Sequence, residues 1–120
     1  MITEERFKVL QHIREYIFRV DASLENFPKK EIEIKVRIRE NLYDLLEIAY
    51  EANMSSNVER KKELLEKSIA KVKVIDFLLN MSLEKKLITG KKYLKFGEKM
   101  NDIMKYLSGW LKKIKEGNNI

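Results

Sequence analysis

The chain has 120 residues and no cysteine, so one domain with a single core is expected, and disulfides and thiolate chemistry are excluded. No apolar run approaches the ~20 residues of a membrane span, and the first residues lack the basic-then-apolar pattern of a signal peptide. We therefore expect a cytoplasmic protein that does not contact a membrane. The net charge of +6 is uneven, because residues 1–59 carry −3 and residues 60–120 carry +9, which favours an anionic partner contacted mainly through the second half.

One proline, four glycines and 37% charged residues predict long helices with solvated outer faces. A first helix is expected over residues 4–26, because apolar residues recur every three or four positions. This predicted core stripe consists of Leu10, Ile13, Ile17, Val20 and Leu24. Pro28 disfavours the helical conformation at Phe27 and ends the helix before it.

Residues 28–54 allow two interpretations. The strict alternation from Glu31 to Arg39 is typical of a half-buried strand. In a helix, the apolar residues that share one face are Ile34, Ile38, Leu42, Leu45, Leu46 and Ala49. That face continues for four turns and no second strand candidate exists, so we predict a helix over 28–54. Ile32 and Val36 then lie off the core face and are candidates for a subunit contact.

A third helix is expected over residues 57–87, with Asn57 or Ser56 as its cap and Gly90 as a left-handed terminus. It has two apolar stripes. The first consists of Leu65, Ile69, Val72, Leu79, Leu83 and Leu87, and the second of Ala70, Val74, Phe77, Leu78 and Met81. Because a four-helix bundle covers only one stripe, the second predicts contact with another copy of the chain.

Asp76 falls within the first of these stripes. There we expect a buried carboxylate that fixes helix register or subunit number or, as an alternative, binds a ligand. The candidate partners of its carboxylate are Arg14, Arg37, Arg39 and Asn41.

A fourth helix is expected over residues 91–116. Its predicted core face consists of Phe96, Met100, Ile103, Leu107, Trp110, Leu111 and Ile114. Four helices joined by short turns predict an all-α, up-down-up-down antiparallel four-helix bundle that occupies residues 1–120 as one domain and assembles as a homo-oligomer.

The sequence offers little for catalysis. His12 is the only histidine, and there is no Gly-rich phosphate loop and no base to activate a serine, so no metal, cofactor or small-molecule substrate is expected. Arg6 and His12 resemble the Arg–His signature of certain helical-bundle RNases. Six residues along a helix place the two side chains about 120° apart, so they would not converge on one phosphate. We do not expect an enzyme.

Basic residues concentrate in the second half of the chain and are candidates for nucleic-acid binding through the phosphate backbone. They are Arg60, Lys67, Lys71, Lys73, Lys85, Lys91, Lys92, Lys95, Lys112 and Lys113. Lysines dominate and aromatic residues are not interleaved with them, which favours backbone contact over base recognition. A solvated, lysine-rich surface without a partner is the alternative interpretation.

Three segments together carry a family resemblance: Phe27-Pro28-Lys29, Leu64–Leu83 and Tyr106–Lys113. Over about residues 7–115 the chain resembles the Avd-like four-helix-bundle proteins, the accessory variability determinants of diversity-generating retroelements. These are similar to bundle proteins encoded by intervening sequences in bacterial large-subunit rRNA genes. The segment Ser108-Gly109-Trp110 is the most specific part of the resemblance.

The resemblance implies a pentameric barrel with a basic surface that binds the retroelement's reverse transcriptase and its RNA or DNA template without catalytic activity. With the two-sided third helix, it makes the following residues candidates for the oligomer interface: Ile32, Val36, Val74, Phe77, Leu78, Met81 and Trp110. Family members often carry arginines where this chain has Val72–Leu78, and Lys71 and Lys73 are the nearest equivalents. The alternative is a stand-alone bundle of the rRNA-intervening-sequence type with a structural or RNA-associated role. The run Leu46–Glu51 lacks that branch's proline, which favours the retroelement branch.

Overall fold

The computed structural model describes the backbone of residues 4–117 and the side chains of residues 6–117. It contains α1 (Glu4–Leu24), α2 (Ile32–Met54), α3 (Val58–Glu84) and α4 (Gly90–Lys115), with a 3-10 turn, η1 (Lys29–Glu31), before α2. No strand occurs in residues 4–117, so the all-α prediction is confirmed, and the alternating segment at 31–39 is helical. None of the described helices is long and apolar enough to cross a membrane.

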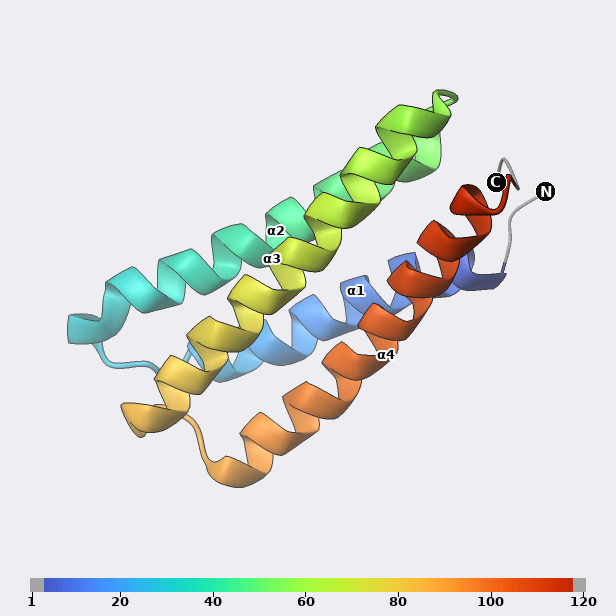
Figure 1. Cartoon of the computed structure of the whole chain (residues 1–120). Helices are drawn as coiled ribbons and strands as arrows, with labels where there is room; N and C mark the ends of the chain where they lie inside the picture. The colour runs from blue at the N-terminus through green and yellow to red at the C-terminus, as the bar shows by residue number, and fades with distance from the viewer. Residues whose placement is uncertain (1–3, 118–120) are drawn as a thin grey trace.

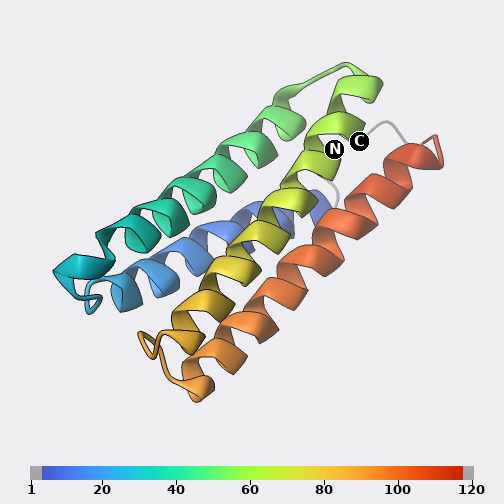
Figure 2. The same cartoon turned by 60° about the vertical axis from the view of Figure 1, so that its left-hand side comes forward.

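The four helices form an elongated bundle of 47 × 23 × 19 Å. Each helix packs against its two neighbours in the order α1, α2, α3, α4 and back to α1, and neither α1 and α3 nor α2 and α4 approach closely. Helices α2 and α4 therefore occupy opposite corners of the bundle, as Figures 1 and 2 show from two directions. The α2–α3 pair is the most closely packed and the α1–α2 pair the least.

Ion pairs show how α2 and α3 are oriented. They join Arg60 to Glu51, Lys71 to Asp44, and Lys85 to Glu31 just before α2. Residue numbers rise along α3 as those of its partners fall, so the two helices run in opposite directions.

The core runs along the inner faces of all four helices. On α2 and α4 it contains the predicted apolar residues, except that Leu46 is half-buried and Ile48 and Ala52 are buried in addition. On α1 two predicted core positions were off by one residue. Val9 and Tyr16 are buried, whereas Leu10 and Ile17 are half-buried. Leu10 lies instead beside the loosely packed α1–α2 seam.

The core stripe of α3 also differs from the prediction. Ile75 faces the core, while Asp76 is exposed and accepts a hydrogen bond from the Tyr93 hydroxyl at 3.2 Å. The expected buried carboxylate, with a partner among Arg14, Arg37, Arg39 and Asn41, was wrong. The reason is that two serines and a lysine complete the buried stripe: Ser68, Ser82 and Lys61. Each serine hydroxyl is satisfied within the helix, since it donates at 2.9 Å to the carbonyl oxygen four residues earlier.

The helix ends depart from the prediction by a few residues. Asn57 caps α3, because its side chain accepts from the Arg60 N–H at 2.9 Å. Lys86, not Gly90, adopts the left-handed conformation after α3, with φ of 63°. The Leu87 N–H donates a hydrogen bond to the Ser82 carbonyl oxygen at 2.8 Å, which terminates α3. Gly90 instead begins α4, whose cap is Thr89.

Candidate functional site

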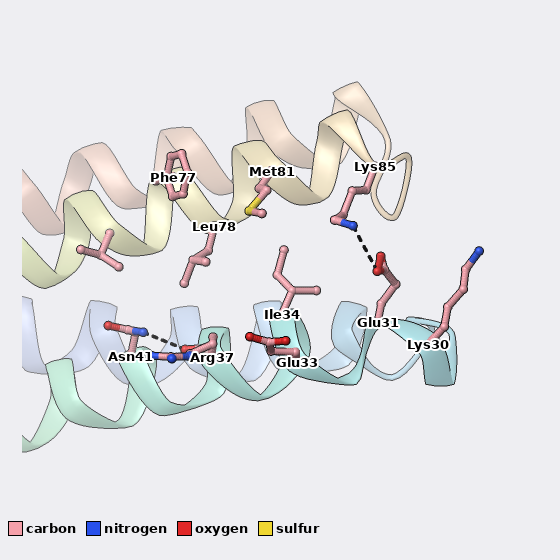
Figure 3. Close-up of a pocket in the computed structure, with 11 residues that line it drawn as sticks. Lys30, Glu31, Glu33, Ile34, Arg37, Asn41, Phe77, Leu78, Met81 and Lys85 are labelled. Carbon is pink, nitrogen blue, oxygen red and sulfur yellow. Dashed lines mark hydrogen bonds and ion pairs between the residues drawn. The ribbon is translucent and has the colours of Figure 1, made fainter.

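An apolar groove lies between α2 and α3. It has a volume of about 500 Å³, and Figure 3 shows Leu78 and Ile34 pointing toward one another across it. Phe77 leaves 63% of its surface exposed, and Val74 and Met81 are also exposed. We call Val74, Phe77, Leu78 and Met81 the α2–α3 apolar face. Its rim is charged, with Lys30, Glu33, Arg37 and Lys85 around the groove.

A second apolar groove, of about 540 Å³, lies between α1 and α2. Phe18 is 77% exposed there, and Phe7 and Tyr50 are exposed beside it. We call this surface the α1–α2 apolar face. Ile32, Val36 and Tyr43 are also exposed and follow the same helical stripe of α2 as Tyr50. The candidate interface residues on α2 and on α3 therefore belong to two different sides of the bundle.

Trp110 belongs to the core, as its place on the predicted core face of the fourth helix indicated, and not to the oligomer interface for which it was also a candidate. Its exposed fraction is 0%, and it is the largest of the fully buried side chains. It supports the bundle from α4 and is not available to a second chain. Of the segment Ser108–Trp110, the most specific part of the family resemblance, the tryptophan therefore serves packing within the bundle, whereas Ser108 is exposed.

Several basic residues of α3, and Lys85 directly after it, are paired with carboxylates. The Lys71 ammonium lies 3.2 Å from Asp44, and the Lys85 ammonium lies 3.2 Å from Glu31 (Figure 3). Arg60 contacts Glu51 at 3.4 Å and Glu63 at 3.8 Å. These cations join α2 to α3, so much of their charge is already compensated. Lys67 and Lys73 are exposed on the same helix.

A basic groove of about 750 Å³ lies on the other side of the bundle, between α1 and the first turns of α4. Five cations line it: Arg19, Lys91, Lys92, Lys95 and Lys99. Among the described residues no carboxylate comes within 4.0 Å of any of their charged groups, although Glu98 also lines the groove. The sequence-based candidates included three of these lysines but not Arg19, because its partners across the groove are about 70 residues away along the chain.

A ring stack lies farther along the same α1–α4 seam. The His12 and Tyr106 rings are stacked with centroids 5.2 Å apart. The Lys8 and Lys105 ammonium groups lie 5.9 and 5.8 Å from the Tyr106 centroid. Two lysines that were not among the sequence-based candidates thus flank an aromatic ring. The remaining candidates, Lys112 and Lys113, lie near the end of α4.

Two buried titratable groups belong to the core. Burial, and to a lesser extent nearby Asp76, raises the pKa of the Tyr16 hydroxyl, which has no hydrogen-bond partner. Burial, together with the nearby Arg6 charge, lowers the pKa of Lys61. In the described part of the chain no group of three His, Cys, Asp or Glu residues could hold a metal ion.

Comparison with known proteins identifies a family. The model of the bAvd-like family aligns with residues 1–114. No curated protein and no solved structure matches the chain significantly.

Proposed function

Because the chain belongs to the bAvd-like family, we propose that it is a non-enzymatic accessory protein of a diversity-generating retroelement. In this role it assembles with copies of itself and binds the reverse transcriptase and its RNA or DNA template through a basic surface. The family match over 114 of 120 residues carries this proposal. The two apolar faces and the lysines of α4 support its two binding activities.

Self-association is supported by the two apolar faces. They differ in composition, and they lie on neighbouring sides of the bundle that share α2. Two different faces favour a head-to-tail contact, in which the α1–α2 apolar face of one copy packs against the α2–α3 apolar face of the next. Such exposed apolar surface is typical of a protein interface.

The geometry favours a small closed ring. Neighbouring sides of an up-down-up-down antiparallel four-helix bundle meet at roughly 90°. Copies joined through faces that meet at roughly 90° close after about four subunits, and a narrowing of that angle to about 72° gives the pentamer expected from the family resemblance. In this ring α2 faces the central axis and α4 faces outward, because they occupy opposite corners of the bundle.

Nucleic-acid binding is supported by the charge of α4. Its lysines are residues 91, 92, 95, 99, 105, 112, 113 and 115, against only Glu98 and Asp102. A surface with this excess of cations attracts the phosphate backbone without regard to sequence. In the proposed ring these lysines lie on the outer wall, where a template and a polymerase have access.

The bundle-RNase alternative is disfavoured by the surroundings of His12. Its ring is stacked on Tyr106, between α1 and α4. Arg6 lies near Lys61 of α3 instead. These contacts place His12 against α4 and Arg6 close to α3, which gives no support to a shared phosphate site.

Co-purification tests the proposed role. The tagged chain is expressed with the reverse transcriptase encoded beside its gene, and the captured material is assayed for the polymerase and for bound template RNA. We expect both to be retained at low salt and the RNA to be released as salt rises. Absence of a neighbouring polymerase gene, or failure to retain its product, would favour the stand-alone bundle of the rRNA-intervening-sequence type.

A further inference from the structure

We propose that the groove between α1 and α4, lined by Arg19, Lys91, Lys92, Lys95 and Lys99, holds the phosphate backbone of the nucleic acid. This inference rests on the proposed function and gives it a place on the molecule. It also distinguishes two groups among the basic residues. The α1–α4 groove binds phosphate, whereas the paired cations of α3 hold α3 to α2.

The first argument is that the groove cations, unlike Lys71 and Lys85, are not paired with carboxylates among the residues that the structure describes. A lysine already within 3.2 Å of a carboxylate, as Lys71 and Lys85 are, gains little from a phosphate because the carboxylate competes for it. The five groove cations have no such carboxylate in the described part of the chain. Several unpaired like charges side by side repel one another, and a polyanion relieves that repulsion while its own counterions are released.

The second argument is spacing. Lys92, Lys95 and Lys99 lie three and four residues apart and so share one stripe of α4. At 1.5 Å per residue they extend about 10 Å along the helix axis, which matches about three phosphates of a strand that advances 3.4 Å per nucleotide. Arg19 contributes a cation from the opposite wall on α1. The first turn of α4 lies in the same groove, and its positive end favours an anion there.

The third argument concerns the kind of polyanion. About 10 Å beyond Lys99 along α4, by the rise per residue, the seam reaches the stacked rings of His12 and Tyr106. Lys8 and Lys105 flank the tyrosine ring. A cationic track that ends at aromatic rings is typical of surfaces that hold a nucleic-acid strand by its phosphates and stack its bases.

The fourth argument is access. The groove lies on α4, and the two apolar faces both flank α2 at the opposite corner. Packing of further copies against those faces therefore leaves the groove open. Several copies in one ring would present their grooves around the outer wall, and one long nucleic acid could engage more than one of them.

Two charge-matched triple variants test the location. The groove variant is Lys92→Gln, Lys95→Gln and Lys99→Gln, and the control variant is Arg60→Gln, Lys71→Gln and Lys85→Gln, the three cations that are paired between α3 and α2. The affinity of each for a labelled mixed-sequence DNA duplex and for a labelled oligouridylate is measured by fluorescence anisotropy over a range of salt concentrations. Circular dichroism and light scattering establish that fold and mass are unchanged.

For the groove variant we expect the slope of log affinity against log salt to become less steep by about 2 to 3, since each phosphate contact contributes about 0.7 to 0.9. The control variant should keep nearly the slope of the unmodified protein. Equal losses in both variants, or a larger loss in the control, would overturn the location while leaving nucleic-acid binding in place. Loss of polymerase capture by a groove variant that retains full RNA affinity would assign the groove to a protein partner and also overturn the inference. No binding by the unmodified protein would contradict the proposed function itself.

Discussion

Replacing Phe77 with serine should weaken self-association without unfolding the chain. Phe77 is 63% exposed in the single chain. An aromatic side chain buries about 200 Å² when fully covered, so about 125 Å² of Phe77 remains for a second copy to cover. At about 25 cal/mol per Å², loss of this burial weakens the association by at most about 3 kcal/mol for each contact. The dissociation constant of the contact would then be roughly 100-fold higher in the variant. Sedimentation velocity over a concentration series measures the shift toward the single chain.

Two controls separate association from folding. Leu94 on α4 is 67% exposed but lies away from both apolar faces, so Leu94→Ser should leave the mass unchanged. Trp110→Ala removes a fully buried side chain and should cost about 3 to 5 kcal/mol of the free energy of unfolding. A Phe77→Ser protein with the mass of the unmodified protein at every concentration would refute the assignment of this face to self-association. A Leu94→Ser protein that dissociates equally would refute its specificity.

A mixing experiment tests whether the contact is head-to-tail. Phe18→Ser damages the α1–α2 apolar face and Phe77→Ser the α2–α3 apolar face. Mixed together, the two variants retain one intact pair of faces, namely the α1–α2 face of the Phe77 variant and the α2–α3 face of the Phe18 variant. We expect the mixture to form a heterodimer that neither variant forms alone. A mixture that remains entirely as single chains would contradict the head-to-tail contact.

Three further substitutions test the bundle itself. Lys86→Gly should raise the free energy of unfolding by about 1 kcal/mol in chemical denaturation, because only glycine adopts a positive φ without cost; a decrease would show that the left-handed terminus is misplaced. Tyr16→Phe removes a buried hydroxyl that has no partner and should leave the protein equally or up to about 1 kcal/mol more stable, whereas a clear loss of stability would reveal a hydrogen bond to that hydroxyl. Burial lowers the pKa of Lys61 below its unfolded value of 10.5. In the alkaline window below that value the folded state therefore binds fewer protons than the unfolded state, so the free energy of unfolding should rise with pH there. Lys61→Met should abolish that rise, and an unchanged alkaline profile in denaturant titrations would exclude Lys61 as its source.

The helices and most of their buried faces could be predicted from periodicity. On α2 and α4 nearly every position that faces the core is aliphatic or aromatic, so the spacing of these residues alone identifies the buried side of each helix. Prediction failed where polar residues are buried. Ser68, Ser82 and Lys61 hold core positions of α3, and their polarity shifted the inferred stripe by one residue, onto Asp76. Serine hydroxyls that bond back to their own helix leave no signature in the pattern of apolar residues.

The candidate surfaces were harder to predict, because they depend on which residues different helices bring together. Periodicity identified the exposed stripe of α3. It could not show that Ile32 and Val36 lie on another side of the bundle, because it does not say how the helices are arranged around one another. The groove between α1 and α4 joins Arg19 to lysines that follow α3, and the stack of His12 on Tyr106 joins residues from opposite ends of the chain. Ion pairing likewise requires coordinates. Lys71 and Lys95 are both lysines on helices, and the sequence does not distinguish them. Of the two, only Lys71 forms an ion pair with a carboxylate in the described part of the chain.

The mass of the unmodified protein in solution tests the central claim most directly, because both the ring and the outward position of α4 follow from self-association through the faces that flank α2. Light scattering at micromolar concentration is predicted to give about five times the chain mass of 14.3 kDa, independent of salt. A single species of 14.3 kDa under the same conditions would contradict the account.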